Sequence, residues 1–417
     1  MIGCSTIAPD LREMDAMTTS FISKAVPGDS GIDGDTRQNS LASHPRLQAM
    51  RQEILSVHGK RIQETLWANP RIETEWENLA GDKGGLHGSE FTISLSQEIP
   101  LNGVLTWKEQ TIRKEEEEAQ WRYQEELFSL LSDVYLAYHL AMLEEYRDRS
   151  LRKLVDIATN FAEKLKEGAN LGKIPKSDFL KAEVSLVNAK IKLNQAETNK
   201  SIAKQRLASL LLCDESKLPV WKESDLPEVY TPSWAQLQSM IQEMPSLKKL
   251  ESAQSRIAMQ KSQVQRERWP NPEVTVGGRR NYEENQNTLL LGIGLSLPVW
   301  NRNQGSIYEL DALLEKNIQE QKNAKLELEK ELFASHKKAV SSKENLEKYR
   351  LKALPAVEEA FQMSRQGYEE GKVSILEVIL AQQAQLEIQL EYWQEAENFY
   401  TAMSSIFRLV GPGKIHK

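Results

Sequence analysis

The sequence predicts a mainly α-helical chain with a small membrane β-barrel, built from a duplicated unit of helix, β-hairpin and long helical hairpin. Three observations predict this fold. Long stretches have helical periodicity, two pairs of short segments alternate with period two, and the pattern returns after roughly 200 residues. Each unit supplies two strands, and the four strands of one chain are too few for a barrel, which needs about eight. We therefore expect the barrel to close only in an oligomer, with the long helices continuing it as a coiled-coil tunnel.

The composition fits long helices better than globular domains. Charged residues make up 27% of the 417 residues and aromatic residues only 7%, which leaves few large side chains for a globular core. The net charge of -7 argues against a nucleic-acid-binding surface. No run of about 18 apolar residues occurs, so the sequence excludes a transmembrane helix. Membrane strands remain open, because only alternate residues of such a strand meet lipid.

The first 43 residues are polar and contain several Gly and Pro residues, and we expect a partly disordered leader over 1–43. Within it, Ile2-Gly3-Cys4-Ser5 resembles the end of a lipoprotein signal, where a cysteine after a small residue becomes acylated. The basic and apolar segments that should precede such a cysteine are missing. Two interpretations stay open: Cys4 is a lipidation site of a longer precursor, or the short match is a coincidence.

The first structural repeat is expected over 44–218. A helix ends at Asn69-Pro70, where the period changes to two, and a Gly-rich turn then separates two strands. Two long helices follow, joined by a break at Gly168–Pro175. The apolar residues of the second have the three-and-four spacing of a coiled coil, with one polar lapse at Lys200. The expected elements are strands 71–79 and 89–99 and long helices 104–167 and 176–212.

The second structural repeat is expected over 245–411. It follows a Pro-rich linker with a short helix, 219–244, and precedes a C-terminal tail, 412–417. Asn271-Pro272 repeats the earlier Asn-Pro, and Pro355 is expected to kink the first long helix. The expected elements are strands 273–280 and 288–299 and long helices 306–366 and 374–410.

The alternation in the strands separates an apolar face from a polar face. In a shared barrel the apolar face meets lipid and the polar face meets water in the lumen. The expected lumen-facing residues are Glu73, Glu75, Glu77, Ser94, Ser96, Gly292 and Gly294. The expected lipid-facing residues are Ile72, Trp76, Phe91, Ile93, Leu95, Val274, Val276, Leu289, Leu291 and Ile293.

The repeated pattern resembles the TolC family of outer-membrane efflux ducts over about residues 44–411. The resemblance rests on the duplicated Asn-Pro before a hairpin, Leu-Ser-Gln-Glu-Ile at 95–99 and Gly-Lys-Val-Ser-Ile-Leu-Glu-Val at 371–378. The segment Asn69–Asn78 is similar to the branch that serves cobalt–zinc–cadmium efflux. The resemblance implies a homotrimer with a twelve-stranded barrel in the outer membrane of a Gram-negative bacterium and a periplasmic tunnel. Its implied partners are a periplasmic adaptor and an inner-membrane pump of the RND class.

The family closes its tunnel with a Tyr, an Arg and two Asp at the tip of the second repeat. Tyr368 matches the Tyr and Glu377 replaces the first Asp. Val373 and Leu380 stand at the Arg and second Asp positions, so that network cannot form here. Asp178 is the equivalent of Glu377 in the first repeat. The alternative is that both carboxylates only stabilise the first turns of their helices. The candidate aperture residues are Asp178, Glu377, Tyr368, Lys173 and Lys372.

No other motif suggests chemistry. The six histidines have no ligand spacing, and no nucleophile–base pair or phosphate-binding loop is recognisable. We expect no enzyme activity, no cofactor and no resident metal. The run Glu115–Glu118 is expected on a solvated helix face or along the tunnel. The competing interpretations are a soluble coiled-coil scaffold and a periplasmic adaptor, although an adaptor would carry one helical hairpin rather than two.

Overall fold

The computed structural model describes residues 41–79, 88–221 and 230–411. The described residues divide into two compact units, and each unit combines parts of both sequence repeats. The first unit contains residues 50–122 and 246–324, and the second contains 41–49, 123–245 and 325–411. Most of the expected leader, including Cys4, and the C-terminal tail lie outside the described residues.

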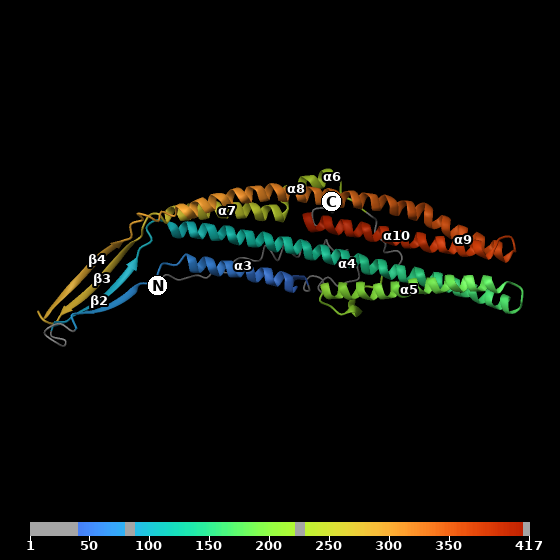
Figure 1. The fold of residues 1–417 in the computed structure, drawn as a ribbon, viewed down its shortest axis with the longest axis horizontal. Coiled ribbons are helices and arrows are strands. Elements are labelled where there is room, and N and C mark those ends of the chain that lie inside the picture. Colours follow the sequence, from blue (N-terminus) through green and yellow to red (C-terminus); the bar gives the residue numbers. More distant parts are fainter. Residues whose placement is uncertain (1–40, 80–87, 222–229, 412–417) are drawn as a thin grey trace. The chain divides into compact units, whose positions relative to one another are not determined.

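A four-stranded antiparallel sheet lies in the first unit, with strand order β1-β2-β3-β4 (Figure 1). The hairpins of the two repeats join through β2 and β3, so that the sheet is continuous across the duplication. Its outer strands, β1 and β4, each pair on one side only. The strands are β1 (Arg71–Glu77), β2 (Glu90–Glu98), β3 (Pro272–Asn281) and β4 (Gln286–Leu295).

Two strands end earlier than the alternation predicts. β1 ends at Glu77 because Asn78 has a φ of 58°, in the left-handed region that breaks a strand. β4 ends at Leu295 rather than at 299. Pro298 lies in the segment 296–299 that was expected to continue the strand, and it has no N–H to donate to a ladder. The sheet register is unaffected by these shorter ends.

Four helices lie wholly or partly in the first unit: α3 (Pro45–Glu64), α4 (Val104–Asn170), α7 (Pro245–Arg266) and α8 (Gln304–Lys348). Of these, α3, α4 and α8 continue into the second unit. The strands extend from the ends of these helices (Figure 1). Both helix-to-strand junctions carry the Asn-Pro pair, although α3 ends at Glu64 and α7 at Arg266, before each pair is reached.

The run Glu115–Glu118 on α4 is a packing element rather than the solvated face that the sequence suggests. Its side chains are half-buried, and each contacts a residue of α3 or α7. The contacts are Lys60–Glu115 (2.8 Å), Arg61–Glu116 (3.1 Å), Ser252–Glu117 (2.9 Å) and Arg256–Glu118 (3.0 Å). Four consecutive carboxylates point around the helix, so they bind helices on different sides of α4.

The second unit consists of long helices that meet at two short turns (Figure 1). In it, α4 leads to α5 (Lys176–Leu210), and α9 (Leu354–Glu369) leads to α10 (Ile375–Val410). The expected kink at Pro355 takes the form of a π-helical turn, Tyr349–Ala353, between α8 and α9. Pro355 cannot donate to the carbonyl of Leu351, which explains why the backbone widens just before it.

The core of the second unit is formed mainly by α4 and α10. Leu127, Leu130 and Leu131 of α4 and Ile406 of α10 are almost fully buried. The linker helix α6 (Trp234–Met240) packs on α8, with Trp234 against Phe333 at a ring distance of 5.1 Å. Across the three described ranges, no helix combines the length and the apolar character needed to cross a membrane.

Candidate functional site

The sheet register places all ten expected lipid-facing residues on one face. In one row across the sheet, Ile72 lies opposite Leu95, Leu95 opposite Val276, and Val276 opposite Leu291. The remaining six fall in parallel rows, because each pairing step in the antiparallel sheet keeps opposite residues on the same face. These six are Trp76, Phe91, Ile93, Val274, Leu289 and Ile293.

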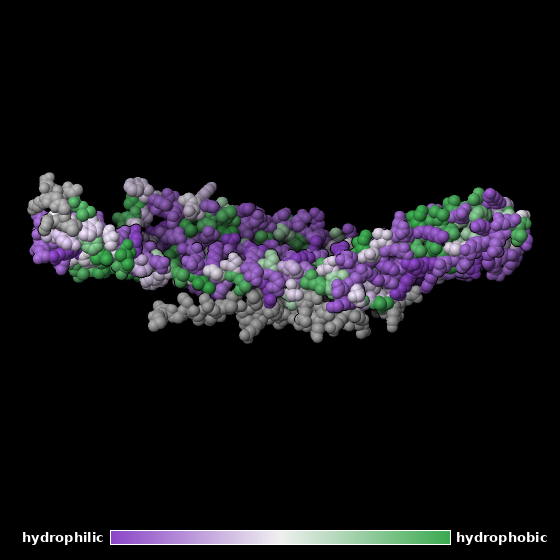
Figure 2. All heavy atoms as spheres, turned by 90° about the horizontal axis from the view of Figure 1, so that it is seen from below, coloured by the Kyte–Doolittle hydropathy of each residue, from purple (hydrophilic) through white to green (hydrophobic). Residues whose placement is uncertain are grey.

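The apolar face of the sheet is exposed, and the polar face is sheltered mainly on its two central strands. On the apolar face, Leu291 is 75% exposed and Ile293 is 80% exposed, whereas on the polar face Ser96 is only 4% exposed. Figure 2 shows apolar side chains gathered over part of the strands. Burial of apolar area is the main favourable term in water, so this large exposed apolar face indicates a surface that meets lipid or another protein.

The polar face is predominantly acidic. Eight charged side chains of the four strands fall on it, six of them glutamates and two of them arginines. Arg71 pairs with its neighbour Glu73 at 2.8 Å, and Arg279 contacts Glu77 and Glu90 at 3.0 and 2.9 Å. The charged residues of this face are Arg71, Glu73, Glu75, Glu77, Glu90, Glu98, Glu273 and Arg279.

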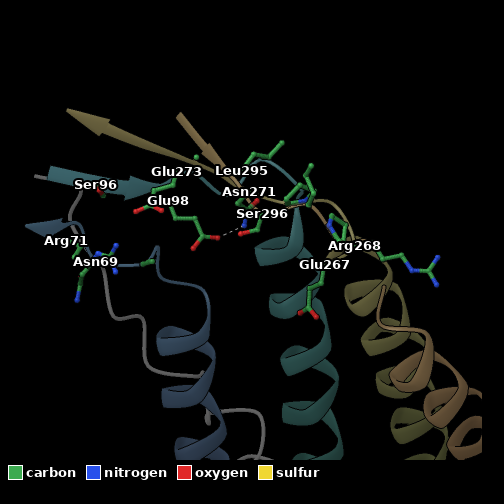
Figure 3. A pocket seen from close by; sticks show the side chains of 15 residues that line it. Asn69, Arg71, Ser96, Glu98, Glu267, Arg268, Asn271, Glu273, Leu295 and Ser296 are labelled. Atoms are coloured by element: carbon green, nitrogen blue, oxygen red, sulfur yellow. Dashed lines mark hydrogen bonds between the residues drawn. The ribbon is translucent and has the colours of Figure 1, made fainter. Parts of the chain in front are cut away.

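A polar recess of about 670 Å³ lies where the sheet meets the helices (Figure 3). It is lined by both helix-to-strand junctions, including Asn69 and Asn271. Asn271 donates from Nδ2 to Glu98 Oε1 at 2.8 Å, and Glu98 lies opposite Glu273 in the sheet register. The recess therefore places two carboxylates at the helix end of the polar face.

The two helical turns at the end of the second unit have the same backbone geometry. Gly172 and Gly371 have φ values of 67° and 72°. In both turns the next residue donates its N–H to a carbonyl five residues earlier, Lys173 to Gly168 and Lys372 to Gly367. This is a Schellman motif, which requires a left-handed residue and so favours glycine. The structure thus reproduces the repeat at the level of single hydrogen bonds.

The structure brings two of the candidate aperture residues together. Asp178, in the first turn of α5, forms an ion pair with Lys181 at 3.3 Å. Burial raises the pKa of Tyr368, and the charge of Asp178 raises it further, which places the two groups close to each other. Tyr368 also packs edge-on against Phe161, at a ring distance of 5.8 Å.

The other three candidates are exposed. Lys372 pairs with Glu370 at 2.5 Å, and this contact lowers the pKa of Glu370. Glu377 and Lys173 point into solvent, and neither has an ion pair with the described residues. The single chain therefore places Tyr368 within reach of the charge of Asp178 but shows no network that joins all five residues in the described part of the chain, and their role stays a prediction.

Sequence reasoning missed the polar layers between the helices of the second unit. Lys200, the polar lapse in the coiled-coil seam, donates to Asp148 of α4 at 2.6 Å. Nearer the tip, Gln382 and Gln385 of α10 are more than nine-tenths buried, and Gln382 lies 3.4 Å from Ser185 of α5. The polar residue Lys200 within the apolar seam was a sequence signal of such a layer, but its partner depends on how the two helices align.

Within the parts of the chain that are described, no group of three or more His, Cys, Asp and Glu residues could hold a metal ion.

Comparison with known proteins gives a consistent result. The model of the family described as "Outer membrane efflux protein" matches residues 36–211 and again 237–412. The cobalt-zinc-cadmium resistance protein CzcC of Cupriavidus metallidurans is 24% identical over 388 residues, which covers 89% of this chain and 88% of that protein.

Two solved structures have a similar fold. CusC, described in terms of transmembrane channel formation, superimposes with a TM-score of 0.75 at 15% identity, over 95% of this chain and 92% of CusC. The outer-membrane channel OprN superimposes with a TM-score of 0.76 at 15% identity, over 95% of this chain and 96% of OprN.

Proposed function

Because the chain belongs to the outer membrane efflux protein family, we propose that three copies form the exit duct of a three-part efflux system that exports heavy-metal cations. The family makes the chain an outer-membrane efflux protein with a periplasmic helical part. The trimer, the partners and the cargo are proposals.

The exposed apolar face of the four-stranded sheet is the observation that carries the proposal. The apolar face of the sheet is exposed, its polar face is sheltered mainly on the two central strands, and both edge strands lack a neighbour on one side. Open edges next to an apolar face would aggregate in water, and closing the sheet removes them. Three four-stranded sheets joined edge to edge make a twelve-stranded barrel with apolar residues outside and carboxylates inside.

A second apolar row on α5 supports lateral contact between copies. The residues are spaced by four, three and four positions, as in a coiled coil, and are separate from the Ala seam that packs within the chain. Their exposure in one chain is explained by a neighbouring copy whose helix covers them. The residues of this row are Leu180, Val184, Val187 and Ile191.

We further propose that the tip turns form the periplasmic aperture, with Asp178 and Glu377 repeated in each copy around the opening. Rings of carboxylates favour cations over anions. The exposed charged residues of the turns, Lys173 and Lys372 among them, would meet the periplasmic adaptor, which connects the duct to an RND pump in the inner membrane. The support is the position of both turns at one end of the second unit (Figure 1).

The cargo proposal rests on the acidic polar face and on the resistance named for CzcC, a protein similar over most of its length. Six glutamates and two arginines leave each chain with a net charge of about -4 on this face, which favours cations in a lumen. A duct of this kind conducts passively, and the pump supplies the energy and selects the substrate.

Fractionation and conductance test the duct. We expect the protein in the outer-membrane fraction as an oligomer that dissociates on heating, and a cation-preferring conductance after purified protein is added to planar bilayers. Recovery as a soluble protein without such an oligomer would instead support a coiled-coil scaffold or an adaptor.

Deleting the gene should lower the cobalt, zinc and cadmium concentrations that stop growth, and normal growth in all three metals would reject the cargo proposal.

A further inference from the structure

Arg279 links three strands at the hairpin end of the polar face, its own and two others. It lies on β3 and donates from Nε to Thr92 Oγ1 at 3.0 Å. Its Nη1 contacts Glu90 of β2 at 2.9 Å, and its Nη2 contacts Glu77 of β1 at 3.0 Å. Arg has a planar fork of five donors, which suits it to hold two carboxylates at once.

The two carboxylates are directly opposite each other in the register, Glu77 with Glu90. Like charges in opposite positions of a sheet repel each other, so this pair needs a cation between its members. Asn281 donates to the second oxygen of Glu90 at 3.0 Å, which completes its hydrogen bonding. Both oxygens of Glu90 and one of Glu77 are therefore occupied by protein donors.

The helix end of the same face has a matching carboxylate pair without an arginine. Glu98 lies opposite Glu273 in the register, and Glu98 accepts a hydrogen bond from the neutral amide of Asn271. Within the described strands, neither of these carboxylates has an ion pair. The polar face thus carries two opposed carboxylate pairs, and only the pair at the hairpin end is neutralised.

We propose that Arg279 is a specificity-determining residue of the duct, which occupies Glu77 and Glu90 and so prevents exported divalent cations from binding at the hairpin end of the lumen. The proposal rests on the proposed function, because it requires the polar face to line the lumen. Two adjacent carboxylates are ligands for divalent cations such as zinc. With Arg279 in place, cations are attracted along the lumen but are not held where they leave it.

The test compares Arg279→Gln with Arg280→Gln. Both remove one positive charge from adjacent residues of β3, but Arg280 lies on the opposite face, across from Phe91. In planar bilayers with a potassium chloride gradient, R279Q should raise the cation-to-anion permeability ratio about two-fold, since it adds one negative charge per chain to the lumen. Zinc chloride added to the bath should block R279Q at about ten-fold lower concentration than the wild type. R280Q should behave as the wild type in both measurements.

Further variants keep the test decisive. Arg279→Lys should retain wild-type selectivity, and the double variant R279Q with Glu77→Gln should recover it because its net charge equals that of the wild type. If R279Q does not assemble, replacing both Glu77 and Glu90 by Gln in the presence of Arg279 should shift selectivity towards anions. Equal selectivity and zinc block in the wild type and in either lumen variant would overturn the role of Arg279. A wild-type protein without conductance would instead reject the duct itself.

Discussion

Asp148 of α4 and Lys200 of α5 form an ion pair of 2.6 Å inside a seam of apolar side chains. The side chain of Asp148 is 3% exposed and that of Lys200 is 22% exposed. Burial by itself would raise the pKa of Asp148, but hydrogen bonds from Lys200 and Arg152 lower it below its usual value. The pair therefore favours one register between the two helices, since a shifted helix would leave the carboxylate with only Arg152 of its own helix as a partner.

Lys200→Met should lower the free energy of unfolding by about 2–3 kcal/mol, because it leaves Asp148 buried with only Arg152 as a partner. Adding Asp148→Leu should recover most of this loss, since no unpaired charge then remains. Lys181→Met, which breaks the exposed pair with Asp178 on the same helix, should cost less than about 0.5 kcal/mol. Urea unfolding followed by helical circular dichroism measures all of these, and equal losses for K200M and K181M would contradict the buried seam pair.

Gly371→Ala should destabilise the tip by about 1–2 kcal/mol, because a residue with a side chain is strained at a φ of 72°. The matched control is Gly59→Ala within α3, where a Cβ would meet no atom within 4 Å. That change should stabilise the protein by up to about 1 kcal/mol through helix propensity. Thermal unfolding of the two variants should therefore shift in opposite directions, and a shift in the same direction would refute the assigned turn geometry.

The protein should lose stability as the pH falls from about 6.5 to about 4. His139 is fully buried against Tyr400, at a ring distance of 4.1 Å, and burial lowers its pKa from 6.5 to about 4. Between these values the unfolded chain binds a proton that the folded chain does not, so acid favours unfolding by up to roughly 3 kcal/mol per chain.

His139→Phe keeps an aromatic ring at this position and removes the titrating group. The melting temperature of this variant should change less between pH 7 and pH 4 than that of the wild type. Melting curves at a series of pH values measure the difference. An identical fall in melting temperature between pH 7 and pH 4 in both proteins would show that other groups determine the loss of stability in acid.

Leu291→Lys should prevent stable insertion, because a charge on the lipid face costs about 2–4 kcal/mol near the bilayer centre. Leu290→Lys is the matched control, since Leu290 is the adjacent residue of β4 and lies on the polar face opposite Gly277. The amount of heat-dissociable oligomer in outer membranes distinguishes the two. Loss of the oligomer in both variants, or in neither, would reject the assignment of the faces.

Replacing Asp178 and Glu377 together by Ala should reduce the preference for cations, because it removes two carboxylates per chain from the proposed aperture. The control is Glu215→Ala, which removes an exposed carboxylate outside both tip turns. Reversal potentials in planar bilayers measure the preference. Unchanged selectivity in the double variant would leave both residues with the helix-stabilising role that their first-turn positions allow.

Much of the fold could be predicted because its signals are local. Period-two alternation identified both hairpins, and the pairing then placed Ile72, Leu95 and Leu291 in one row as their alternation required. The turns between the long helices followed from Gly172 and Gly371, whose backbone conformations are set by the residues themselves, whereas α3 ends before the Asn-Pro pair that was expected to stop it.

The sequence by itself therefore determined the duplicated unit, the two-faced strands and the repeated tip turns, because each depends on residues a few positions apart. Only the tertiary structure decided the partners of Lys200, the packing role of Glu115–Glu118 and the three-strand contact of Arg279. Arg279 and Glu77 are far apart in the chain and come from different repeats. Their contact depends on the register between β2 and β3, which joins the two halves of the duplication and which no local pattern encodes.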